Sequence, residues 1–307
     1  MVSIELRPTG PFRLDLTAWA LRRRARNRID VWDGAYRRAL VIHGQAMAVE
    51  VTQLTRRRPT ILTLTISGPP RTLSQARIAL AQEVVETSLG LDVDLSPFYR
   101  LARDGDPHLD DLVSRFRGLK PPRFPSLFEA LVNAVACQQF SLEAGLTLLN
   151  RLTEAYGLVP AGLHPAMAAF PEPVALAGAS PADLRQLGFS NRKAESLIGL
   201  GIAVLDGSLD DLGLASLPRA EASNALQGLA GIGRWSAEYA LLRGLGRLDV
   251  YPGDDVGARN KLRSFLGLSA PPDYAAVNRL TAPWAPFQGM VYFHLLLHGL
   301  AERGALA

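Results

Sequence analysis

Strand-type and helix-type patterns occupy separate parts of this sequence, and that separation restricts the fold more than any other feature does. The first third holds short segments rich in Val, Ile and Thr that are divided by Gly, Pro or charged turns, and we expect strands at 3–6, 39–43, 46–53 and 60–67. Apolar residues at helical spacing predict helices at 17–26 and 74–88. These elements indicate a small α+β domain with an antiparallel sheet.

The rest of the chain reads almost entirely as helix. The segment 118–125 contains Pro121, Pro122 and Pro125, which resist regular structure and mark a boundary. We therefore expect a mixed α/β N-terminal domain at 1–118 and an all-α region at 119–307. Two of its helices should follow the N-caps Ser126 and Ser141, and the others should occupy 191–205, 218–227, 234–244, 255–266, 274–281 and 287–302.

Composition limits the class of protein. The 307 residues are 48% hydrophobic and 20% charged, enough for a sizeable core. The net charge of +4 suits a polyanionic partner without requiring one. Arginine supplies nearly all of it, which offers forked contacts to phosphate, although a GC-rich genome gives the same bias. The single cysteine, Cys137, excludes an internal disulfide and a cysteine-ligated iron-sulfur cluster or zinc site.

Neither end of the sequence predicts export or membrane insertion. Glu5 and Arg7 lie where a signal peptide would need an apolar run. The longest apolar stretch, around 290–300, is too short for a membrane span and is interrupted by His294 and His298. These histidines have zinc spacing but no acidic partner between them, so a metal site is not expected. We expect a cytoplasmic, nucleoid-associated protein with no membrane role.

The segment Leu229-Ala230-Gly231-Ile232-Gly233-Arg234-Trp235 lies between two expected helices. Two glycines separated by one residue allow a tight turn and leave the amides at the start of the second helix open to a phosphate. The segment 219–244 therefore predicts a helix-hairpin-helix, and an ordinary helix connection is the alternative.

Twenty residues after Trp235 comes Tyr251-Pro252-Gly253-Asp254-Asp255, at the start of another expected helix. A carboxylate there is kept ionised by the helix dipole and free amides. Either aspartate could be a simple N-cap. The pairing of a phosphate-binding hairpin with an anionic residue one helix further on favours a functional site.

The stretch from Leu229 to Asp255 resembles the signature of the helix-hairpin-helix DNA glycosylases. Gly-Ile-Gly-Arg-Trp-Ser-Ala-Glu-Tyr at 231–239, Leu-Arg-Gly at 242–244 and Pro-Gly-Asp-Asp at 252–255 are most similar to the alkylpurine branch, DNA-3-methyladenine glycosylase II. Weaker similarity extends to 128–141, 188–197 and the mixed N-terminal domain. The resemblance implies a base-excision repair enzyme that flips a damaged base out of duplex DNA.

Carried over by position, the resemblance makes Asp255 the catalytic aspartate, with Asp254 as the fallback and the expected helix cap. A carboxylate suits this role because loss of a purine builds positive charge on the sugar. Trp235 fills the position of the lysine with which bifunctional members attack the sugar, so the resemblance implies an N-glycosylase without lyase activity.

Trp235 and Tyr239 are four residues apart and can line one wall of a base pocket, where aromatic faces attract a cationic alkylated purine. A pair of core aromatics is the alternative. Trp19 is a further pocket candidate, although helix packing explains it equally well. In the alignment with the alkylpurine branch, Leu296 replaces another pocket aromatic, which leaves the pocket's shape open.

The hairpin residues Gly231, Ile232, Gly233 and Arg234 are predicted to contact the DNA backbone. Gln139 or Phe140 lies where the family inserts a wedge into the gap left by the flipped base, and an ordinary capped helix junction is the alternative. Lys193, at another helix start, is a minor candidate for a phosphate contact.

No cofactor is expected. In related proteins the hairpin carbonyls hold a structural sodium or potassium ion, which here implies the backbone of Gln227, Leu229 and Ile232. The predicted partner is double-stranded DNA with damaged bases, bound by a monomer. Two other functions stay open: the same fold acting on deaminated or oxidised bases, and a non-catalytic helix-hairpin-helix DNA-binding protein.

Overall fold

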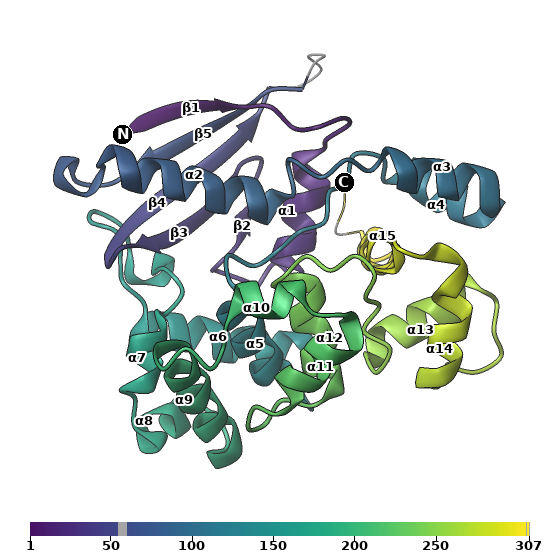
Figure 1. The fold of residues 1–307 in the computed structure, drawn as a ribbon. Helices are drawn as coiled ribbons and strands as arrows, with labels where there is room; N and C mark the ends of the chain where they lie inside the picture. Colours follow the sequence, from purple (N-terminus) through teal and green to yellow (C-terminus); the bar gives the residue numbers. More distant parts are fainter. Residues whose placement is uncertain (55–59, 305, 307) are drawn as a thin grey trace.

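The N-terminal strands form one antiparallel sheet in the computed structural model, which describes residues 1–54, 60–304 and 306 (Figure 1). The strands lie in the order β1 (Val2–Leu6), β5 (Leu62–Ser67), β4 (Gln45–Gln53), β3 (Tyr36–Ile42) and β2 (Val31–Trp32). The first four of these confirm the sequence prediction. The two-residue β2 is too short to produce a recognisable pattern.

Strand alternation gives the sheet one apolar face. Every second residue of β4 and β5 is buried: Met47, Val49, Val51, Leu62, Leu64 and Ile66. This face packs with α1 (Leu14–Arg22) and α2 (Gln75–Leu89) in the smaller of two hydrophobic cores. The predicted α+β domain with a small antiparallel sheet is therefore confirmed.

Helix α1 lies between the two cores. Leu14, Ala18 and Leu21 belong to the core under the sheet, whereas Leu16 and Ala20 belong to the larger, helical core. The predicted end at residue 26 is wrong, because Arg23 has a positive φ of 62°, which a right-handed helix does not allow, and the helix ends at Arg22. Residues 23 and 24 are thereby carried into the helical part of the protein.

The remaining elements are helical, which confirms the predicted all-α core. The N-caps Ser126 and Ser141 precede α5 (Leu127–Cys137) and α6 (Leu142–Tyr156), as predicted. The other long helices are α9 (Asn191–Leu205), α11 (Arg219–Gln227), α12 (Arg234–Arg243), α13 (Val256–Phe265), α14 (Tyr274–Thr281) and α15 (Gln288–Ala301). Within the described residues, no helix is long and apolar enough to span a membrane.

The sequence pattern misses several helices. These are α3 (Ser96–Gly105), α4 (Pro107–Arg115), α7 (Pro173–Ala177), α8 (Pro181–Gln186) and α10 (Asp211–Ser216). The last three span five or six residues, too few for a helical period to be visible. Phe98 of α3 and Leu109 of α4 are fully buried in the larger core, although both helices precede residue 118. The division at residue 118 stays a prediction.

Helix α5 is the centre of the helical region. Residues 127–136 are all buried, because the helix is packed by α6, α9 and α12 (Figure 1). A buried ion network joins it to the sheet: Arg38 of β3 donates to Asp30 at 2.8 Å and to Glu129 of α5 at 2.6 Å. This network fixes the sheet against the helices that carry the candidate site.

Candidate active site

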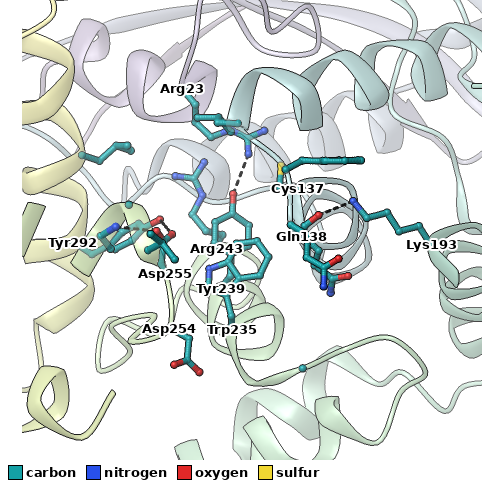
Figure 2. Close-up of a pocket in the computed structure, with 18 of the residues that line it drawn as sticks. Arg23, Cys137, Gln138, Lys193, Trp235, Tyr239, Arg243, Asp254, Asp255 and Tyr292 are labelled. Atoms are coloured by element: carbon teal, nitrogen blue, oxygen red, sulfur yellow. Dashed lines mark hydrogen bonds between the residues drawn. The ribbon is translucent and has the colours of Figure 1, made fainter. Parts of the chain in front are cut away.

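A cavity of about 730 Å³ opens between α5, α9, α12, α13, α15 and residues 23 and 24, which follow α1 (Figure 2). Its volume lies within the usual range for small-molecule and cofactor sites. The lining combines the carboxylates of Asp254 and Asp255, an aromatic wall, buried arginines and the turn between α5 and α6. Sequence elements that lie far apart in the chain therefore form a single site.

Asp255 is fixed in this cavity by two hydrogen bonds. Its Oδ1 accepts the amide of Ala258 at 2.8 Å, so Asp255 is the N-cap of α13. Its Oδ2 accepts the hydroxyl of Tyr292, at 3.2 Å, from α15 (Figure 2). Burial and the neighbouring Asp255 carboxylate hold the pKa of Tyr292 well above its ordinary value, so the hydroxyl remains a donor.

Asp254 has a different role from the helix cap that the sequence predicts. Its Oδ2 accepts from Arg234 at 2.6 Å, and the Arg234 guanidinium also lies 3.7 Å from the ring centroid of Tyr274. The cap is Asp255 itself, because α13 begins one residue later than expected. Asp254 therefore tethers the start of α12 to the loop that carries Asp255.

Trp235 and Tyr239 form one wall of the cavity, as their spacing predicts. Their ring centroids are 5.6 Å apart and the ring planes differ by 31°. The Nε1 of Trp235 is buried without a hydrogen-bond partner in the described structure. Trp19 lies outside the lining, packed under the guanidinium of Arg22 at 5.2 Å from its ring. Residues 23 and 24, which follow α1, line the cavity instead.

Two buried arginines stand behind the aromatic wall. Arg23 donates to the Tyr239 hydroxyl at 3.1 Å and to Asn133 Oδ1 at 2.7 Å. Arg243 donates to the carbonyl of Ala20 and stacks over Phe124, whereas its Nε and Nη2 have no partner in the described structure. Burial lowers the pKa of Arg243. Of the two arginines, Arg23 fixes the orientation of the Tyr239 hydroxyl, because it donates a hydrogen bond to that oxygen.

The hairpin between α11 and α12 requires glycine at only one of its two positions. Gly231 has φ of 82°, and a Cβ there would lie 2.0 Å from Oγ of Ser196. Around Gly233 a Cβ would meet nothing within 4 Å, so the start of α12 is open to an approaching group. Ile232 is buried and anchors the hairpin in the larger core.

The other predicted residues lie at the cavity's edge. Gln139 and Phe140, in the turn between α5 and α6, are exposed and line the cavity. Lys193 also lines it, but its amine donates to the carbonyl of Gln138 (Figure 2) and to that of Ala136. Leu296 lies in the lining from α15.

Metal-binding side chains do not gather here: the described residues contain no group of three or more His, Cys, Asp or Glu that could hold an ion. His294 is buried, with Nδ1 2.8 Å from the carbonyl of Met290, and His298 contacts Glu302 and Arg115. In the hairpin, the Leu229 carbonyl accepts from Ile232, which leaves a second lone pair, and neutral carbonyl oxygens suit a monovalent cation.

Sequence reasoning misses Arg23, Arg243 and Tyr292. The sequence pattern places residue 23 within the helix expected at 17–26, and an arginine gives no sequence signal of burial. Arg243 stands inside the Leu-Arg-Gly motif at 242–244. That motif is the one signal that could have identified it.

Residues 132–286, about half the chain, match the family model described as HhH-GPD superfamily base excision DNA repair protein. The chain belongs to this family. The match begins within α5 and contains the hairpin and Asp255 of this HhH-GPD protein.

Named relatives agree with the family. The DNA-3-methyladenine glycosylase of Bacillus subtilis is 31% identical over 205 residues, 67% of either chain. The solved 3-methyladenine DNA-glycosylase from Archaeoglobus fulgidus has a TM-score of 0.79 at 26% identity and covers 97% of this chain and 98% of that one. The Schizosaccharomyces pombe 3-methyladenine DNA glycosylase in complex with abasic-DNA has a TM-score of 0.56 at 27% identity, over 66% of this chain and 95% of that one.

Proposed function

We propose that this HhH-GPD protein is a monofunctional DNA N-glycosylase that removes alkylated purines, of the 3-methyladenine and 7-methylguanine type, from duplex DNA. One observation carries the proposal: a carboxylate fixed by two hydrogen bonds faces the same cavity as an aromatic wall. The names of the related glycosylases support the substrate class.

Asp255 would supply the chemistry. Departure of the base leaves positive charge on the sugar, and a fixed carboxylate beneath it stabilises that charge in the transition state. The same group orients or deprotonates the attacking water. Tyr292 and the amide of Ala258 hold both carboxylate oxygens, so little reorganisation is needed when the charge develops.

Trp235 and Tyr239 would receive the flipped base. An alkylated purine is cationic and leaves easily, so stacking and cation-π attraction favour it without a full set of hydrogen bonds. Arg23 keeps the Tyr239 hydroxyl in place. Gly231, Ile232, Gly233 and Arg234 would meanwhile bind the DNA backbone at the open start of α12.

We expect no lyase activity, because tryptophan occupies position 235, where bifunctional members of the family have the lysine that attacks the sugar. Two lysines do line the cavity. The Lys193 amine is bonded to two carbonyls, and the amine of Lys261 lies 3.4 Å from the Gly257 carbonyl. Lys261 is therefore the residue to examine if strand cleavage is found.

The expected partner is damaged double-stranded DNA, in agreement with the DNA complex of the yeast relative, and we propose a monomer because one hairpin can serve one flipped base. No cofactor is proposed. A sodium or potassium ion held by the carbonyls of Gln227, Leu229 and Ile232 would add positive charge at the phosphate. A repair role would place the protein in the cytoplasm, with the nucleoid.

The test is base release from duplexes that carry 3-methyladenine, 7-methylguanine, hypoxanthine or 8-oxoguanine, with strand cleavage measured before and after alkali. We expect release of the methylated purines and an intact strand before alkali. Release of only the deaminated or oxidised base would refute the alkylpurine assignment. DNA binding with no release from any duplex would indicate a non-catalytic binding protein.

A further inference from the structure

The turn between α5 and α6, residues 138–141, is held rigidly although it lies at the cavity's mouth. Gln139 has φ of 57°, a left-handed conformation that is rare outside glycine. The Gln138 side chain donates to the Gly231 carbonyl at 2.9 Å and to Ser236 Oγ at 2.8 Å. The turn is therefore tied to the hairpin. Phe140, which follows Gln139 in this turn, has 49% of its surface exposed.

Lys193 of α9 holds the same turn from the other side. Its Nζ donates to the carbonyl of Gln138 at 2.8 Å (Figure 2). It also donates to the carbonyl of Ala136 at 3.0 Å, where α5 ends. These carbonyls are among those that a helix leaves unsatisfied at its C-terminus, where a cation is also favoured by the dipole. The amine lies 3.9 Å from the ring centroid of Phe140. Only 8% of Lys193 is exposed.

Helix α9 holds the hairpin with the same face. Ser196, three residues after Lys193, fills the space that a Cβ at Gly231 would need. Residues three apart on a helix are neighbours on its surface. The hairpin and the turn therefore both contact one face of α9, which keeps a fixed spacing between them across the cavity.

We infer that Lys193 is a positioning residue that holds Phe140 as the side chain that fills the gap in duplex DNA when a base is flipped out. This inference rests on the proposed function. An apolar side chain inserted between base steps keeps the duplex open. Phe140 has that chemistry, and its ring is held on the amine instead of moving freely.

The bonds of Lys193 also distinguish this role from the phosphate contact that the sequence suggests. An amine that donates to two carbonyls and lies over an aromatic ring would have to give up these contacts to reach a phosphate. Burial lowers the pKa of Lys193, since desolvation disfavours its charge.

The test compares single-turnover base release from two duplexes. In one the damaged base is paired, and in the other, called the gapped duplex, it lies opposite an abasic site, so that no base faces it. Pairing makes the wedge necessary, and the gap removes that need. Lys193→Met and Phe140→Ala should each slow release from the paired duplex about tenfold, the size of one charge-assisted contact, and from the gapped duplex about twofold at most. Lys193→Arg should retain most of the rate, and the double variant should be no slower than either single variant.

Several results would overturn the inference. Equal losses on both duplexes would indicate a structural role alone, and additive losses in the double variant would show that the two residues act independently. A salt dependence of binding that falls by about one phosphate in Lys193→Met would indicate a phosphate contact. A paired-duplex loss in Gln139→Ala but not in Phe140→Ala would assign the wedge to Gln139.

A second readout separates this inference from the proposed function. Fluorescence of 2-aminopurine beside an abasic-site analogue reports unstacking and needs no bond cleavage. Lys193→Met should reduce the fluorescence gain as much as Phe140→Ala does, and an undiminished gain would refute the inference. Wild type that raises the fluorescence but releases no base would refute only the proposed function. Phe140 is exposed, so its variant tests the wedge even if Lys193→Met folds poorly.

Discussion

Replacement of His294 by leucine should remove a large part of the decrease in the free energy of unfolding that this protein shows in acid. His294 is fully buried in α15, between the rings of Phe98 and Phe116, with centroid distances of 5.3 and 6.4 Å. Its Nδ1 is bonded to the Met290 carbonyl, and its Nε2 has no partner in the described structure. Burial lowers its pKa from 6.5 to about 4.

The sign follows from linkage. The unfolded chain takes up a proton at His294 near pH 6.5, whereas the folded chain does so only near pH 4. The stability is therefore complete above pH 6.5 and falls as the pH drops towards 4. The interval between 6.5 and about 4, at about 1.4 kcal/mol per pH unit, corresponds to about 3 kcal/mol.

Urea unfolding from pH 7.5 to 4 would measure this effect as the difference in free energy of unfolding between wild type and variant. Subtraction removes the shared contribution of the carboxyl groups. The advantage of wild type over His294→Leu should shrink by about 3 kcal/mol across the interval. His294→Gln, which is polar but cannot titrate, should show the same shrinkage. A difference that is independent of pH would refute the reasoning.

Three further substitutions probe the fold and the site. Arg38→Met should lower the free energy of unfolding, measured by urea titration, by about 4 kcal/mol, because two buried carboxylates lose their cation. A loss below about 1 kcal/mol would contradict this expectation. Gly231→Ala should cost about 2 kcal/mol in the same assay, from positive φ and a close approach to α9, and it should weaken DNA binding. Tyr292→Phe should slow single-turnover base release roughly tenfold with the thermal midpoint nearly unchanged, and an unaltered rate would exclude its role in orienting the carboxylate.

The fold was largely predictable from local pattern. Alternation in β4 and β5 and the serine caps of α5, α6 and α9 correspond to interactions within a few residues, which a sequence displays directly. The end of α1 was not predictable, because Arg23 leaves the helix to make contacts more than a hundred residues away. Short helices such as α8 contain too few turns to show a period.

The site was predictable where one motif carried it. Trp235, Tyr239 and Asp255 lie in one continuous stretch, and the structure brings them to one cavity. The support behind them comes from separate elements: Tyr292 from α15 and Arg23 from the segment that follows α1. Such contacts depend on how helices pack, and neither spacing nor composition reports that. For the same reason, the sequence could not show that Trp19 lies outside the cavity lining.

The most direct test of the central claim is single-turnover release of a methylated purine from duplex DNA by wild type and by Asp255→Asn. Asparagine keeps the size of the side chain and an oxygen that can cap α13, but it removes the negative charge. We predict a loss of at least about a hundredfold in rate with DNA affinity retained. An Asp255→Asn variant that releases the base at the wild-type rate would contradict the assignment of Asp255 as the catalytic residue.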